Sequence, residues 1–274
     1  FFPNLSIEQK INDSNKISLA MSRRIERPQY GQLNPFMFYL DKDTYFRGNP
    51  YLRPQYSNIG ELSYTFKEKY IATLRYTRIK DMMEEFITQD DSSKASISTE
   101  RNYDKTDIYS LSLTVPIQVT KWWSSDNNTD LSYNKFRFED PITGDPFFRY
   151  NLHYYISSTN TITLPHDMKV EVIGYYNSPF VFGIFSGYAQ YNLNLGVQKM
   201  FLDKKATVKL SYNNILRNES YRGSADFRNL SMSIFNTWQF RTVNLSFSYK
   251  FGNASIKAAR ERKTGTSDEQ NRAG

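Results

Sequence analysis

Apolar and polar residues alternate strictly near the end of the chain, from Thr242 to Phe251. Alternation with a period of two is typical of a strand that has one apolar face and one polar face. A tilted strand of about ten residues is also long enough to cross a bilayer. We therefore predict a membrane-spanning strand whose apolar positions face lipid. These lipid-facing positions are Val243, Leu245, Phe247, Tyr249 and Phe251.

The same alternation recurs along the chain and predicts roughly eleven strands. Short turns, such as 12–15 and 67–69, alternate with long polar connections. Outer-membrane barrels have short periplasmic turns and long extracellular loops. The pattern therefore predicts an all-β fold, an antiparallel transmembrane β-barrel of outer-membrane type. Because closed bacterial barrels have even strand numbers, we expect about half of a barrel of about 22 strands, with the other half missing upstream.

Composition supports a barrel over a soluble domain. The chain has 274 residues, of which 39% are hydrophobic and 16% aromatic, with a mean hydropathy of -0.64. This apolar content is low for a soluble core, whereas a barrel needs apolar residues only at every second position. No run of apolar residues is long enough for a transmembrane helix. The net charge of +7 comes without a basic helix, so we do not expect nucleic-acid binding.

Four long segments are predicted as loops from their polar, Pro and Gly residues. They are 23–57, 80–105, 177–187 and 218–240. The first is rich in Tyr and Arg, which suit stacking on glycans or chelates. It is the candidate ligand-facing loop, although packing of the same side chains against the barrel rim would explain them equally well. The candidate residues are Arg23, Arg24, Arg27, Tyr30, Phe36, Tyr39, Tyr45 and Tyr51.

Trp122 and Trp123 stand together at a predicted short connection. An indole ring is half apolar and half polar, and it therefore suits the boundary between lipid and water. We predict that the pair belongs to an interfacial aromatic girdle. Burial in a soluble core is the alternative, which the surrounding polar residues disfavour.

No catalytic constellation emerges from the sequence. His153 is predicted as a polar wall residue and His166 as a turn residue, and they are far apart in the chain. Glu84 and Glu85 form an acidic pair inside a predicted loop, where solvated charge is the simpler interpretation. Nucleophile motifs, phosphate-binding loops and metal-ligand spacings are lacking. We therefore expect neither an enzyme nor a bound metal or cofactor.

The chain is expected to divide at the end of the last predicted strand. Residues 1–251 form the C-terminal part of the barrel in this interpretation, and 252–274 form a polar, mostly disordered periplasmic tail. The chain begins with Phe1 and carries no signal peptide, although an outer-membrane protein must be exported. We therefore expect the start of the precursor to be missing.

Several motifs resemble a known family. They are SRRIERPQYGQLNPF (22–36), GNPYLRPQY (48–56), ELSYTF (61–66), TKWW (120–123), LSYNNIL (210–216) and the closing SFSYKFG. Together they are similar to the outer-membrane β-barrel family of the Bacteroidetes, whose members are TonB-dependent receptor-like proteins. The motifs cover essentially the whole chain, but they are architectural and do not identify a ligand.

The resemblance implies a location in the outer membrane and uptake of a nutrient such as a glycan or a chelated metal. It also implies an upstream plug, a TonB-type energy transducer that acts through the absent N-terminus, and insertion by the outer-membrane assembly machinery. A passive porin, or a structural or adhesive surface barrel, is the alternative. A soluble β-rich glycan-binding domain is a third hypothesis, but it does not explain an apolar stripe on nearly every strand.

Overall fold

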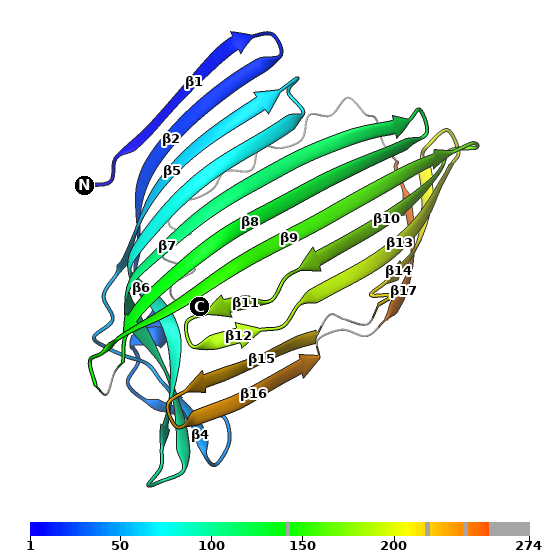
Figure 1. Cartoon of the computed structure of the whole chain (residues 1–274). Coiled ribbons are helices and arrows are strands. Elements are labelled where there is room, and N and C mark those ends of the chain that lie inside the picture. The colour runs from blue at the N-terminus through cyan, green and yellow to red at the C-terminus, as the bar shows by residue number, and fades with distance from the viewer. Residues whose placement is uncertain (141–142, 217–219, 238–240, 252–274) are drawn as a thin grey trace.

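The structure, a computed structural model, describes residues 1–140, 143–216, 220–237 and 241–251. Its main feature is an antiparallel sheet in which eleven strands lie side by side in chain order. Figure 1 shows this sheet as a curved wall of long strands. The strands are β1 (Asn4–Asn12), β2 (Asn15–Glu26), β5 (Gln55–Phe66), β6 (Tyr70–Asp90), β7 (Ala95–Thr120), β8 (Trp123–Glu139), β9 (Pro146–Leu164), β10 (Met168–Asn177), β13 (Gln190–Phe201), β14 (Ala206–Asn213) and β17 (Thr242–Tyr249).

β1 and β17 form the two edges of the wall. In the part of the chain that the structure describes, β1 pairs with β2 and β17 pairs with β14, and no ladder joins β1 to β17. The wall is therefore open, which agrees with the predicted partial barrel. Its eleven strands agree with the predicted number of crossings. β17 ends at Tyr249, slightly before the predicted end at Phe251.

The two faces of the wall differ in polarity, as the alternation predicts. On one face Leu74 of β6 lies opposite Leu62 of β5 and Leu111 of β7. Leu74 is 56% exposed, so this apolar face is uncovered. On the other face Glu61 and Arg75 are cross-strand neighbours, and their side chains form an ion pair of 2.7 Å. We call these the apolar face and the polar face.

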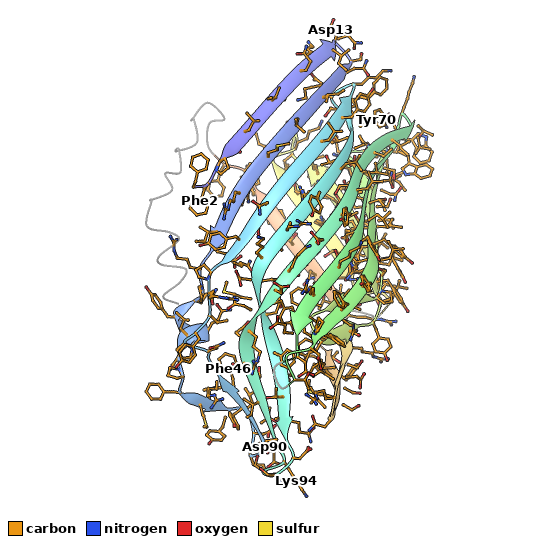
Figure 2. All side chains as sticks on the ribbon, turned by 60° about the vertical axis from the view of Figure 1, so that its left-hand side comes forward. Phe2, Asp13, Phe46, Tyr70, Asp90 and Lys94 are labelled. Atoms are coloured by element: carbon orange, nitrogen blue, oxygen red, sulfur yellow. The ribbon has the colours of Figure 1, made fainter. Side chains whose placement is uncertain are left out.

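The two ends of the wall also differ. Figure 2 places Asp13 and Tyr70 at one end and Phe46, Asp90 and Lys94 at the other. We call them the turn end and the loop end. The connections at the turn end are short, and those at the loop end carry most of the additional structure, in agreement with the predicted alternation of short and long connections.

The prediction of a loop over 80–105 is wrong. β6 continues to Asp90 and β7 starts at Ala95, so the two strands form a tall hairpin with a short turn between them. The hairpin extends beyond the neighbouring strands at the loop end (Figure 2). The alternation of residues is lost here because both faces of the hairpin contact other protein segments, so that neither face is simply lipid or water.

The predicted loop over 23–57 is shorter than expected and partly ordered. β2 continues to Glu26 and β5 begins at Gln55. The intervening segment contains a single helical turn, α1 (Tyr30–Leu33), and a small hairpin of β3 (Met37–Tyr39) and β4 (Thr44–Arg47). Thr44 to Phe46 of β4 pair in parallel with Ser96 to Ser98, near the start of β7. This pairing fixes the segment to the tall hairpin.

Two more predicted loops form a second sheet instead. The segment 177–187 contains β11 (Phe180–Phe182) and β12 (Phe185–Gly187). The segment 218–240 contains β15 (Ser220–Phe227) and β16 (Leu230–Thr237). These strands pair in the order β11-β12-β15-β16, and Figure 1 shows them beside the lower half of the wall. Arg149, on the polar phase of β9, donates a hydrogen bond to Ser186 of β12, so the second sheet faces the polar side of the wall.

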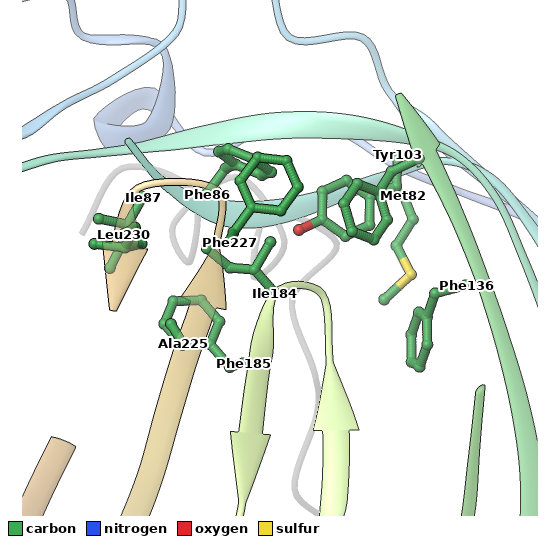
Figure 3. Packing of buried hydrophobic residues seen from close by; sticks show 11 residues of the cluster. Met82, Phe86, Ile87, Tyr103, Phe136, Ile184, Phe185, Ala225, Phe227 and Leu230 are labelled. Atoms are coloured by element: carbon green, nitrogen blue, oxygen red, sulfur yellow. The ribbon is translucent and has the colours of Figure 1, made fainter. Parts of the chain in front are cut away.

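The hydrophobic core lies between the second sheet and the tall hairpin. Phe227 of β15 packs edge-on against Phe86 of β6, with ring centroids 5.1 Å apart, and Tyr103 of β7 stacks on Phe138 of β8 at 4.5 Å. Figure 3 shows Ile184 and Phe227 pointing from the second sheet into this cluster. Within the described residues, no helix is long and apolar enough to cross a membrane.

Candidate functional site

The predicted ligand-facing residues do not converge on one pocket. Arg23 lies on β2 with its guanidinium 5.2 Å from the ring centre of Tyr56. Tyr39 and Tyr45 meet across the β3–β4 hairpin at 5.7 Å. The remaining members are exposed around the segment 24–51, and the most exposed are Tyr51 at 86% and Phe36 at 80%. The others are Arg24, Arg27 and Tyr30.

A cleft of about 550 Å³ opens at the loop end, and Tyr51 is the predicted candidate that lines it. We call it the polar cleft. One wall comes from the segment 49–53, the floor from β7, and the other wall from the turn between β8 and β9. Its polar lining consists of two arginines, two asparagines and three carboxylates: Arg53, Arg101, Asn49, Asn102, Asp104, Glu139 and Asp140. Its apolar lining consists of Phe86, Tyr103 and Phe138.

Asn102 holds one wall of the polar cleft in place. Its amide oxygen accepts a hydrogen bond from the backbone nitrogen of Arg53 at 2.8 Å, and its amide nitrogen donates to the backbone oxygen of Arg53 at 2.8 Å. The Arg53 guanidinium also pairs with Asp81 of β6 at 2.5 Å. Asn49 donates to the backbone oxygen of Glu100. The segment 49–53 is therefore attached to the tall hairpin by side chains at both of its ends.

Arg101 is the cation of the polar cleft with unused hydrogen-bonding capacity. Its Nε is buried and has no hydrogen-bond partner among the described residues. Its guanidinium lies 5.7 Å from the ring centre of Phe86. Burial lowers the pKa of Arg101, and the nearby Arg47 adds to the effect. A planar cation beside aromatic rings suits an oxygen-rich ligand, because guanidinium donors bind hydroxyl and carboxylate oxygens while rings stack on the ligand's flat faces.

A second cleft, of about 340 Å³, lies between β6 and the second sheet. Its lining comprises two carboxylates, one aliphatic side chain and four aromatic rings: Glu84, Glu85, Ile234, Phe180, Phe182, Phe185 and Tyr221. We call it the acidic cleft. Burial raises the pKa of Glu84 to about 8, with further contributions from Glu100 and Glu85. Burial also raises the pKa of Glu100. Glu84 lies in strand β6 and is partly buried, so the interpretation of Glu84 as solvated loop charge is wrong, whereas Glu85 is exposed.

The polar face of the wall carries paired charges along its length. Lys209 of β14 reaches across β13 to Glu171 of β10, with an N–O distance of 2.9 Å. Ser63 and Thr73 share a hydrogen bond of 2.8 Å. These contacts bridge neighbouring strands and make this face of the wall polar. Such a surface suits a water-filled or plug-filled interior.

The histidines occupy the structural positions that the sequence predicts. His153 lies on the polar phase of β9 and shares a hydrogen bond of 2.7 Å with Asn177. His166 has a φ of 61° in the turn between β9 and β10. In the described part of the chain, no group of three or more His, Cys, Asp or Glu residues could hold a metal ion.

The two tryptophans lie at the turn end. Trp122 is 52% exposed and stacks on Trp123, with ring centroids 6.3 Å apart. The Trp123 Nε1 donates to Asn160 of β9 at 3.0 Å. One ring is thus free to face outward while the other is anchored to the wall. Their membership of an interfacial girdle stays a prediction.

Comparison with known proteins agrees with the fold, since it identifies a β-barrel family. Residues 1–249 match the model of the outer membrane protein beta-barrel family. No curated protein matches the chain.

Solved structures resemble the fold at low sequence identity. The siderophore receptor PirA from Pseudomonas aeruginosa has a TM-score of 0.60 at 14% identity over 91% of this chain. The copper transporter OprC has a TM-score of 0.61 at 12% identity, also over 91%. A mutant of the ferric enterobactin receptor PfeA from Pseudomonas aeruginosa, in complex with enterobactin, has a TM-score of 0.57 at 18% identity over 91%. The match covers 42%, 40% and 40% of those chains, respectively.

Proposed function

Because the chain belongs to the outer membrane protein β-barrel family, we propose that it forms part of the wall of a receptor that takes up a nutrient across the outer membrane. The wall supplies lipid-facing strands and the loop-end surfaces that meet the ligand. A plug within the completed barrel and a TonB-type energy transducer would drive the uptake. The outer-membrane assembly machinery would insert the protein.

The observation that carries this proposal is the polar cleft. It combines the Arg101 side chain, which lines the cleft, with the aromatic rings of Phe86 and Phe138. The segment 49–53 is tied down by Asn102, so the cleft is largely formed before a ligand arrives. A preformed cleft with a few polar groups and aromatic walls is typical of ligand sites. Its mixed lining of arginines, carboxylates and aromatic rings fits a polyhydroxylated ligand such as a glycan, or a chelated metal.

A passive porin, or a structural or adhesive barrel, is the second candidate. The polar face, with ion pairs such as that of Lys209 with Glu171, favours it. Such a surface would let polar solutes pass without selecting among them. The two candidates differ in their need for energy, because passive flow continues when the proton gradient is removed.

The test uses cells that produce the full-length protein as their only route for a candidate nutrient. Growth on a panel of glycans and of ferric chelates as sole carbon or iron source identifies the nutrient, and short-term entry of the labelled nutrient into the periplasm is then measured with and without a protonophore. We expect protein-dependent uptake of one panel member that stops when the gradient collapses. Uptake that continues without the gradient favours the porin. Absence of any protein-dependent uptake across the panel contradicts both transport functions.

The polar cleft is tested in the same cells. Arg101→Ala removes a guanidinium from the lining of the cleft and should weaken uptake by about tenfold or more, since a lost hydrogen bond to a charged group is worth about 1.5–3 kcal/mol. Arg222→Ala is the matched control, because Arg222 is an arginine of the loop end that lies over Phe235, away from the cleft. Equal losses in the two variants would remove the polar cleft from the proposal.

A further inference from the structure

On β6, β7 and β8, the apolar face of the wall changes from aliphatic to aromatic and then to charged residues toward the loop end. A row of leucines lies across these strands in register and is followed by a row of tyrosines. The leucines are Leu74, Leu111 and Leu131. The tyrosines are Tyr76, Tyr109 and Tyr133. A shallow groove of about 580 Å³ runs along these two rows.

Cations occupy the next two rows on the same face. Arg78 pairs in register with Asp107, which pairs with Lys135. One step further, Lys80 pairs with Lys105, which pairs with Arg137. We call the five cations the cationic patch. Three of them, side by side on adjacent strands, repel one another, so this arrangement is unfavourable unless anions lie nearby.

Two carboxylates within the patch neutralise only part of its charge. Asp107 pairs with Arg78 at 2.8 Å and with Lys105 at 3.2 Å. Asp104 pairs with Arg137 at 3.1 Å. Lys80 and Lys135 have no carboxylate within ion-pair distance among the described residues. Lys135 instead lies over the rings of Tyr109 and Tyr133, at 5.7 and 5.4 Å. The ammonium groups of Lys80 and Lys135 therefore remain available.

The position of the patch matches the depth of lipid headgroups. On β7 the apolar face runs from Val119 to Tyr109, which is roughly 33 Å along a strand at about 3.3 Å per residue. With a strand tilt of about 35–45°, this length spans about 25 Å, the height of the apolar band of an outer-membrane barrel. Asp107 and Lys105 begin where that band ends, just beyond tyrosines of the kind that mark the interface.

We propose that the cationic patch and the groove beneath it bind a phosphorylated lipid of the surrounding leaflet. The phosphates would lie against Lys80, Lys105 and Lys135, and an acyl chain would lie in the groove over the leucine row. The continuity of groove and patch on one face distinguishes a lipid from a soluble anion, which would use the patch alone. This binding site is separate from the polar cleft and does not depend on the proposed uptake.

The test uses the full-length protein in detergent and native mass spectrometry. Bisphosphorylated lipid A and lipid A stripped of its phosphates are titrated in parallel. We expect the phosphorylated form to bind at least about tenfold more tightly, since a basic residue near an anionic headgroup contributes about fivefold in affinity. Salt should weaken the binding of the phosphorylated form to the unmodified protein, a measurement that needs no variant.

The variant combines Lys80→Gln, Lys105→Gln and Lys135→Gln. Its control combines Lys67→Gln, Lys69→Gln and Lys205→Gln, which remove three exposed lysines from turns at the turn end. We expect about tenfold weaker binding in the first and no change in the second, both checked for folding by resistance to dodecyl sulfate. Equal binding of the two lipids, equal binding by the two variants, or displacement of the lipid by millimolar inorganic phosphate would overturn the proposal.

Discussion

Glu84 is a carboxylic acid that stays protonated near neutral pH. Its pKa is raised to about 8 by burial against the second sheet and by Glu100 and Glu85. The folded state therefore binds a proton that the unfolded state, with an ordinary pKa near 4.5, releases. The stability that this provides is fully present below about pH 4.5 and is lost as the pH rises toward and through 8.

We predict that the packing of the tall hairpin loosens between pH 5 and pH 9. Glu84→Gln should reduce this pH dependence, because the amide stays neutral over the whole range, whereas Glu100, whose pKa burial also raises, still titrates. The measurement is hydrogen exchange of the amides in 82–103 of the full-length protein, corrected for the intrinsic effect of pH. Glu68→Gln, in an exposed turn, is the control and should leave the dependence intact. A pH dependence of unchanged size in Glu84→Gln would contradict the assignment.

Gly183 allows the β11–β12 turn to rest on Tyr103. Its φ is +57°, and a Cβ at this position would meet the Oη of Tyr103 at clashing distance, with Cε2 and Cζ at 3.1 and 3.2 Å. Both the backbone conformation and the space therefore require glycine.

Gly183→Ala should consequently detach the turn from the hydrophobic core. We expect destabilisation of about 1–2 kcal/mol or more, from the strained φ and the displaced ring. Hydrogen exchange in β11 and β12 should become about fivefold to thirtyfold faster. Gly60→Ala in β5 is the comparison, because a Cβ there meets nothing within 4 Å. A similar response from both substitutions would mean that the contact with Tyr103 is unimportant.

At the scale of elements, β17 is the simplest test of the lipid-facing assignment. Its residues alternate, and Phe247 is 68% exposed on the apolar phase. Phe247 lies opposite Val208 of β14, whereas Ser248 lies opposite Thr207 on the other phase. The two positions share a strand and differ in the face that they occupy.

Phe247→Arg should therefore reduce assembly into the membrane far more than Ser248→Arg. A charge on the lipid face costs about 2–4 kcal/mol near the midplane, whereas the polar face tolerates it. The amount of folded protein in purified outer membranes is the measurement. If the two variants accumulate equally, the apolar phase of β17 does not face lipid.

The tall hairpin and the second sheet behave as one unit at the loop end. Residues far apart in sequence build its core, such as Phe86 with Phe227 and Tyr103 with Phe138. Arg228 of the β15–β16 turn pairs with Asp140 beside β8 at 3.0 Å, and Asn229 donates to Asp91 at 2.8 Å. The walls of both clefts are therefore held by contacts between elements rather than by any single loop.

For the whole molecule, the two ends of the wall should lie on opposite sides of the membrane. We predict that the loop end is extracellular, as in outer-membrane barrels generally. Cysteines introduced at Gln32, Ser92 and Gly144 of the full-length protein should react with an impermeant reagent on intact cells. A cysteine at Glu68, in a turn-end connection, should react only after the cells are broken. The inverse labelling pattern would require the opposite topology.

The open edges of the wall lead to a prediction about the isolated chain. β1 has 9 residues and β17 has 8, and neither pairs on its outer side in the described structure. In lipid, each unpaired backbone group costs several kcal/mol, so two open edges exceed the usual net stability of about 5–15 kcal/mol. Residues 1–251 produced alone should therefore aggregate or associate through their edges. A monomer that resists dodecyl sulfate, as expected for the full-length protein, would contradict this argument.

The number of strands and their faces could be predicted from the sequence because lipid and water act on every residue of a strand locally. Leu245 and Ser246 differ in solvent whatever the rest of the chain does, so the pattern of TVNLSFSY records the environment directly. The polar pairing of Glu61 with Arg75 follows from the same alternation. The short connections could also be predicted, because the conformation of a turn such as 67–69 depends mainly on the residues of the turn itself.

The strands and the buried residues of the loop end depend on tertiary structure and could not be predicted from the local sequence. Nothing near Glu84 or Arg101 in the sequence reveals that they are partly buried, because segments up to about 150 residues away line the same clefts. The polar composition of 80–105 and of 218–240 resembles that of loops, yet both form hairpins because each covers the other's apolar side chains. Alternation was therefore sufficient for the part of the chain that faces lipid on one side, and long-range packing determined the part in which both faces of a strand meet protein.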